Sequence, residues 1–313
     1  MGHTAASMDV VVAFLSQHFA WASNPTVVAR QTLAGISNGM LLFLISAGLS
    51  LIFGVSRILN FAHGVLFMLG AYLTASLTSV LSESTGFLGA LVLSSAALFA
   101  VGALIETTLL RRIYHAAHEF QLLLTFALVF VIGDLVKLVW GREDRVVSMP
   151  ALLAGSTRAF GVTFPTYRMF LIGVGVLVAL ALWLFLHRTR WGVLVRAATM
   201  DRQILGALGV NTRTVFTVVF ALGAALAGLA GALAAPIVAV GPGLQVQVLV
   251  DAFVVVVIGG MGSVIGALAA SLIVGIVNAF GVLAFPALAL VVTFFVMAVV
   301  LIARPWGLFG QPE

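Results

Sequence analysis

Two short strings in the sequence have the residue types of catalytic or metal sites. Gly35–Gly39 reads G-I-S-N-G, which has the spacing of a hydrolase nucleophile turn, but that turn joins a strand to a helix and this string opens an apolar run. His115, His118 and Glu119 could bind a metal by type, yet their order matches neither histidine–glutamate zinc motif. We therefore expect no catalytic residue and no metal ligand.

The sequence also lacks the means to bind ATP. No G-x-x-x-x-G-K-[ST] string occurs, and the single lysine, Lys137, lies in an apolar run. There are no cysteines, which excludes disulfides and thiolate metal sites. The arginines behind the net charge of +5 are scattered between apolar segments, so they indicate membrane topology rather than nucleic acid. We expect no cofactor in this chain, so any ATP and Mg²⁺ would be bound by partner subunits.

Ionisable side chains inside apolar segments are the remaining candidates. Each costs about 2.5–3.5 kcal/mol at the centre of a membrane helix, so their presence suggests a function. Asp134 and Lys137 are three residues apart and can neutralise each other on one helix face. Asp251 has no such neighbour, and His63 lies at an interruption of an apolar stretch. Asp251 and His63 are therefore candidates for a transport role.

The elements that hold these residues are those of a membrane protein. The chain has 313 residues, of which 62% are hydrophobic and only 8% charged, whereas a soluble domain has about 25% charged residues. The apolar runs are long and continuous, which favours helices over a barrel. We predict an all-α polytopic integral membrane protein with about 8–9 transmembrane helices, one or two of them broken or re-entrant.

The predicted order along the chain is an N-terminal segment 1–29, a transmembrane domain 30–305 and a tail 306–313. Residues 10–22 are too short to cross and suit an interfacial helix near Trp21. A further run at 247–259 is too short to cross alone unless it is broken or re-entrant. The full-length candidate spans are 33–56, 64–82, 87–110, 121–140, 167–187, 214–235, 263–282 and 284–303.

Basic loops predict the orientation. The connection 188–213 carries five arginines against one acid, which places it in the cytoplasm. The loop 141–166 then lies outside. If 247–259 crosses the membrane, the N-terminus lies outside and the C-terminus inside. Within 188–213, Val193–Leu208 has an apolar helical stripe that suits either a groove on a partner protein or the anionic membrane surface.

Two apolar stretches are interrupted by unusual residues, the first at 57–64 and the second at 259–263. Small residues recur after the second interruption. Paired interruptions are typical of a transport pathway with unwound backbone, although two plain turns would give the same pattern. Small residues at four-residue spacing in 214–235 and after Gly262 permit close helix packing, at a subunit interface or within the bundle. The pathway candidates are Asn60, Phe61, His63, Gly64, Asp251, Gly259, Gly260, Gly262 and Ser263.

The sequence resembles the LivH-type permeases, the membrane subunits of branched-chain amino-acid ABC importers. The resemblance covers about residues 30–310, in the order of the family. It rests on strings at 60–72, 196–211, 259–267 and 304–310. The resemblance implies that 188–213 is a coupling loop, with Arg196, Asp201, Arg202 and Gly209 engaging an ATPase.

The resemblance also implies partners and a location. A second related permease, two cytoplasmic ATPase subunits and an extracytoplasmic solute-binding protein would complete the importer, in the inner membrane of a bacterium. The small, neutral residues at the two interruptions suit an aliphatic zwitterion better than a polyanion. The alternatives are an ABC permease for urea, short amides or organic acids, and an ion-coupled secondary transporter that uses Asp134 or Asp251.

Overall fold

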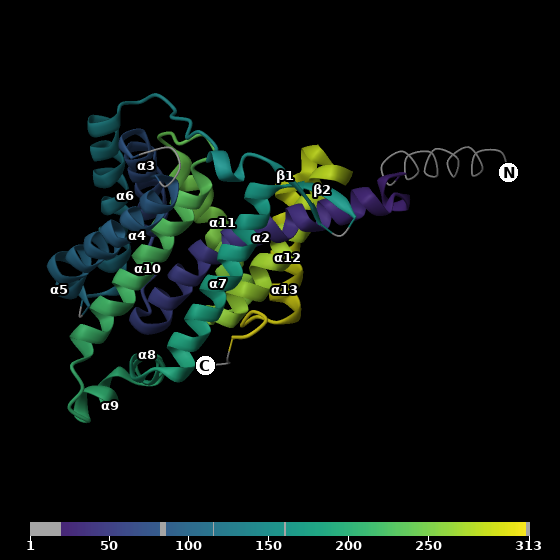
Figure 1. Cartoon of the computed structure of the whole chain (residues 1–313). Helices are drawn as coiled ribbons and strands as arrows, with labels where there is room; N and C mark the ends of the chain where they lie inside the picture. The colour runs from purple at the N-terminus through teal and green to yellow at the C-terminus, as the bar shows by residue number, and fades with distance from the viewer. Residues whose placement is uncertain (1–19, 82–85, 115, 160, 311–313) are drawn as a thin grey trace.

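The computed structural model describes residues 20–81, 86–114, 116–159 and 161–310, and these residues are mostly helical (Figure 1). The long helices are tilted against one another, and the short helices α8 and α9 lie together at one end. The α-helices are α2 (Pro25–Ser56), α3 (His63–Val80), α4 (Gly86–Ile105), α5 (Arg111–Ile113), α6 (His118–Trp140), α7 (Thr166–Arg188), α8 (Arg190–Met200), α9 (Arg202–Ala207), α10 (Thr212–Ala234), α11 (Leu244–Gly259), α12 (Val264–Ala284) and α13 (Ala289–Ala303).

The helix lengths confirm the predicted fold class. Among the described residues, seven helices are long and apolar enough to cross a membrane, and two shorter apolar helices lie at Leu244–Gly259 and Val291–Ala303. A π-helical segment, η2 (Glu106–Leu110), continues α4 into α5. The remaining short helices are the 3-10 segments η1 (Ala20–Ser23), η3 (Ala151–Leu153) and η4 (Pro286–Leu288).

Polar caps fix where several helices begin. The Asn24 side chain accepts from the Thr26 amide and Pro25 occupies the first turn of α2, so this helix begins well before the predicted residue 33. Ser263 caps α12 in the same way. Of the predicted interfacial stretch 10–22, residues 10–19 lie outside the described residues. Trp21, within η1, packs its ring 5.3 Å from that of Phe280.

Small residues bring α10 into close contact with α2, α3 and α4. A methyl group on Gly228 would lie 2.7 Å from the Leu98 side chain of α4, and one on Gly223 would lie 2.8 Å from the Gly48 carbonyl oxygen of α2. One on Gly231 would overlap the Phe67 carbonyl oxygen of α3. The small-residue pattern of 214–235 therefore serves packing within the bundle, because lipid provides no hydrophobic drive for helix association.

The loop 141–166 contains a feature that the all-α prediction missed. Strands β1 (Ser156–Ala159) and β2 (Val162–Pro165) form an antiparallel hairpin, with Ser156 opposite Pro165. Residues of β2 alternate between buried and exposed, and the buried Val162 and Phe164 pack with Leu33 of α2. An isolated bridge also joins Arg145 to Val240, after α10.

The short helix α11 runs from one end of the bundle to the other. It follows the Val240 bridge to the 141–166 loop and ends at Gly259. Just beyond that end, Gly262 packs against Gly54, which also contacts Thr199 of α8. A helix of 16 residues is about 24 Å long, which is less than the roughly 30 Å of a bilayer's hydrocarbon core. The predicted parity of crossings depends on whether this segment crosses the membrane, and it stays a prediction.

The close approach of α10 and α3 at Gly231 should be sensitive to an added methyl group. Gly231→Ala should lower stability by about 1–3 kcal/mol, because the added methyl group must push two helix backbones apart. The measurement is the thermal unfolding midpoint of the purified membrane protein in detergent. Gly173→Ala in α7 is the matched control, since nothing lies within 4 Å of a methyl group there. An unchanged midpoint for Gly231→Ala would contradict the packing.

Candidate translocation and coupling sites

The first interruption is a non-helical segment between α2 and α3, in which Ile58, Asn60 and Ala62 are buried. Arg57 ends α2 with a φ of 57°, in the left-handed region. His63 then begins α3, with its Nε2 atom 2.9 Å from the carbonyl oxygen of Ile45. Ile45 lies about 18 Å before Arg57 along α2. The segment therefore turns back into the bundle, which excludes a plain turn at its surface.

Polar contacts hold this segment in place. Asn60 is buried, and its Oδ1 atom accepts from the Ala62 amide at 3.1 Å. The Phe61 ring lies 4.4 Å from Phe126 of α6 and 5.3 Å from Phe253 of α11. A methyl group on Gly64 would overlap the Gln245 carbonyl oxygen at the start of α11. Residues 60–64 thus form one site in contact with α6 and α11.

The second interruption is a tight turn at the end that carries α8 and α9. Gly260 and Gly262 have φ values of 96° and 87°, a conformation that favours glycine. The C-terminal segment closes this turn, because the amides of Leu308 and Phe309 donate to the carbonyls of Ile258 and Gly259 at 2.8 and 3.0 Å. The C-terminal segment therefore caps α11.

Only part of the predicted pathway set is brought together. Asn60, Phe61, His63 and Gly64 are adjacent, whereas the glycine turn 259–263 reaches α2 at Gly54, before the first interruption. Asp251 is half-buried in α11 and has no ion-pair partner among the described residues. Asp134 and Lys137 pair at 2.8 Å as predicted, on an exposed face of α6.

A contact that the sequence did not reveal links the first interruption to the loop 188–213. The Arg57 guanidinium donates to the Thr199 carbonyl at 3.2 Å, in the last turn of α8. A cation at a helix C-terminus is also favoured by the helix dipole. Next to this bond is a recess of about 420 Å³. Its lining includes Arg57, Gln121, Asp201 and Arg202.

The prediction of a single helix over Val193–Leu208 is wrong, because the structure has two helices there, α8 and α9. The chain leaves helical geometry at Asp201, whose carboxylate accepts from the amides of Gln203 and Ile204 at 2.7 and 3.0 Å. Such a carboxylate begins a new helix rather than continuing the old one. Gly209, with a φ of 81°, directly follows the C-cap residue of α9, a position at which glycine is favoured.

The predicted apolar stripe of this loop faces outward. Met200, Ile204 and Leu208 are 88%, 61% and 75% exposed, while the residues that hold the two helices to the bundle are Val195, Ala198 and Leu205. Large apolar side chains this exposed at the end of a membrane bundle suit docking into a groove.

The charged residues of the loop have different surroundings. Arg196 donates to the Leu186 carbonyl near the end of α7, Asp201 caps α9, and Arg202 is exposed. The capping role of Asp201 was not predicted from the sequence. The string Gly35–Gly39 lies inside α2, with Ser37 buried and both glycines packed on the backbone of α12, so it is a helix contact.

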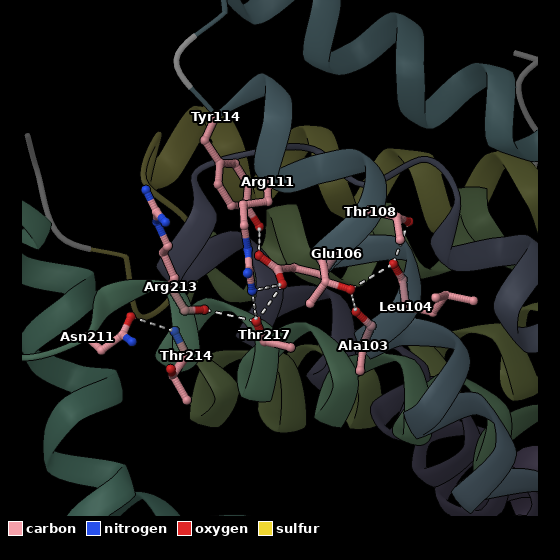
Figure 2. Close-up of polar contacts among 11 residues, drawn as sticks. Ala103, Leu104, Glu106, Thr108, Arg111, Tyr114, Asn211, Arg213, Thr214 and Thr217 are labelled. Carbon is pink, nitrogen blue, oxygen red and sulfur yellow. Dashed lines mark hydrogen bonds and ion pairs between the residues drawn. The ribbon is translucent and has the colours of Figure 1, made fainter.

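A further site that sequence reasoning missed is a buried acid. Glu106 is fully buried in the π-helical segment, and bonds to Arg111, Tyr114 and Thr217 satisfy its carboxylate (Figure 2). Burial, together with this neighbouring carboxylate, raises the pKa of Tyr114 above its ordinary value, so its hydroxyl stays a neutral donor.

The many apolar crossing helices, the buried unwound segment and the exposed apolar stripe beside it define a polytopic α-helical membrane transport protein. The family model described as "Branched-chain amino acid transport system / permease component" matches residues 31–301. The chain belongs to this family, and the resemblance to LivH-type permeases is confirmed.

Curated relatives match along nearly the whole chain. The high-affinity branched-chain amino acid transport permease proteins LivH of Salmonella typhimurium and of Escherichia coli K12 are each 30% identical over 304 residues, covering 91% of this chain and 96% of theirs. The corresponding protein BraD of Pseudomonas aeruginosa is 29% identical over 297 residues, with the same coverage. No solved structure matches the chain.

The cap at Asp201 gives a prediction that separates capping from charge. Asp201→Ala should destabilise α9 by about 1 kcal/mol and lower transport, because two amides lose their acceptor. Asp201→Asn keeps an acceptor oxygen and should retain most activity. The measurement is the initial uptake rate in cells at matched expression. An equal loss of uptake rate in both variants would show that the negative charge, rather than the cap, is required.

Proposed function

We propose that this chain is the permease subunit of an ATP-driven importer that carries leucine, isoleucine and valine into the cytoplasm. In this proposal α8, α9 and the C-terminal segment face the cytoplasm of a bacterium, and the hairpin β1–β2 faces outward. The proposal is supported by the family, by the names of the relatives, and by the arginines of 188–213.

The exposed stripe Met200–Ile204–Leu208 is the single observation that carries the proposal. A membrane helix can bury apolar side chains in lipid, but Met200 and Ile204 lie on the short helices α8 and α9 at the end of the bundle, and Leu208 directly follows α9. The chain has no nucleotide-binding string of its own. A groove on a separate ATPase would cover the stripe and supply the energy, with ATP and Mg²⁺ bound there.

The other partners follow from the same proposal. A second related permease would complete the pathway, a second ATPase would pair with the first, and an extracytoplasmic solute-binding protein would deliver the cargo. Arg196, Arg202 and the Asp201 cap would shape the docking surface, and Gly209 would permit the turn into α10. The chain itself would perform no catalysis.

The segment Asn60–Gly64 is proposed as part of the translocation pathway. Residues 60–62 lie outside helical geometry, most of the segment is buried, and Arg57 just before it bonds to the Thr199 carbonyl of α8, so a displacement of α8 would reach it. The recess of about 420 Å³ beside Arg57 is where cargo would leave. The segment is neutral, as an aliphatic zwitterion requires. Asp251, and Gly259–Ser263 at the end of α11, would move with that helix.

Orientation is tested by cysteine labelling, since the chain has no cysteine of its own. Arg158→Cys in β1 and Arg202→Cys in α9 are both exposed positions. A membrane-impermeant maleimide should label Arg158→Cys in intact cells and Arg202→Cys only after lysis. Labelling of Arg202→Cys in intact cells would reverse the proposed orientation.

Docking is tested by placing a charge in the stripe. Ile204→Lys should weaken binding of the ATPase subunits at least tenfold, because burying an isoleucine contributes about 1.5–3 kcal/mol and an unpaired charge resists burial. The measurement is co-purification of the ATPases with the tagged permease. Gln203→Ala, the exposed neighbour, should bind as the wild type does. Full retention of the ATPases by Ile204→Lys would exclude α9 as the docking site.

A further inference from the structure

The Glu106 network consists of Glu106, Arg111, Tyr114 and Thr217, and it joins two parts of the chain. Glu106 Oε2 lies 3.0 Å from Arg111 Nη2 and accepts from the Thr217 hydroxyl of α10 at 2.5 Å. Arg111 Nη2 also donates to Thr217 Oγ1 at 2.7 Å, so these three groups form a closed triangle (Figure 2). Tyr114 donates to the other carboxylate oxygen at 3.3 Å.

The burial of Glu106 shows that this arrangement is specific. Its side chain is 0% exposed and that of Arg111 is 33% exposed. No other acid among the residues described by the structure is buried. The Thr217 hydroxyl bonds to this buried carboxylate, and this charge-assisted bond joins α10 to the end of α4.

The π-helical segment is what allows the ion pair. Residues five apart lie about 140° from each other around an α-helix and cannot meet. Over Glu106–Leu110 the helix widens, and the Arg111 amide donates to the Glu106 carbonyl. This widening turns Arg111 toward the carboxylate. Single π-turns of this kind occur frequently at functional sites.

The same network packs against residues that hold α8 and α9 to the bundle. The Tyr114 ring packs 5.1 Å from that of Phe216 in α10. Phe216 belongs to the apolar cluster that holds α8 and α9 to the bundle through Val195, Ala198 and Leu205. A force on α8 and α9 therefore has a continuous packed route to Glu106, and from there to α4.

We propose that the Glu106 network transmits the displacement of α8 and α9 to α4, which makes Glu106 and Thr217 positioning residues for transport. This inference rests on the proposed function. The Glu106 network is separate from the docking surface, because none of its four residues belongs to the exposed stripe. With the network intact, α10 and the end of α4 move as one body. Without it, ATP hydrolysis continues but moves less cargo.

The test uses Thr217→Val, which removes the hydroxyl and keeps the shape of the side chain. The assembled importer, with its second permease, ATPases and binding protein, is reconstituted in vesicles, and leucine transported per ATP hydrolysed is measured. A bond to a charged group is strong enough that about a tenfold fall in this ratio is expected. Thr217→Ser keeps the hydroxyl and should match the wild type.

Thr214→Val is the matched control, because Thr214 is exposed one turn earlier in α10. Glu106→Gln removes the charge and should lower the ratio as Thr217→Val does, which provides a second assembled variant if one fails to fold. A wild-type ratio in either assembled variant, or a parallel fall in uptake and hydrolysis, would overturn the inference. Absence of ATP-driven leucine uptake by the wild type would instead overturn the proposed function.

Discussion

The structure depends on one constraint, which is that a chain surrounded by lipid must satisfy its own backbone even where it stops being a helix. At residues 57–62 the chain turns back into the bundle with no ladder of helical bonds. Asn60 accepts from the Ala62 amide, His63 bonds to the Ile45 carbonyl, and the Arg57 guanidinium reaches α8. The unwound segment is therefore held by one internal side-chain bond and by bonds at its two ends to α2 and α8.

Close helix packing follows from the same constraint. An unwound segment can lie inside the bundle only if its neighbours are held together without hydrophobic drive, and the glycines of α10 permit this against α2, α3 and α4. The turn at 260–262 is closed by the C-terminal segment. Both interruptions thus connect to elements at the end that carries α8 and α9, where an external partner could act on them.

Composition and hydrophobic runs were enough to predict the fold class, most of the spans and the small-residue packing, because these reflect the solvent and the packing of single helices. They could not predict that residues 60–64 and the glycine turn lie at different depths, since depth depends on how the segment folds back. The split of 193–208 at Asp201 was missed because its apolar stripe continues across the break. The bond between Thr217 and Glu106 joins residues 111 apart, and no local pattern signals it.

Leucine uptake by vesicles that contain the assembled importer is the measurement that tests the account most directly. It compares ATP supplied on the side of α8 and α9 with an imposed proton or sodium gradient and no ATP. The account predicts uptake with ATP, dependent on the solute-binding protein, and none with either gradient. Uptake by this chain alone under an ion gradient would contradict it and would favour the secondary transporter.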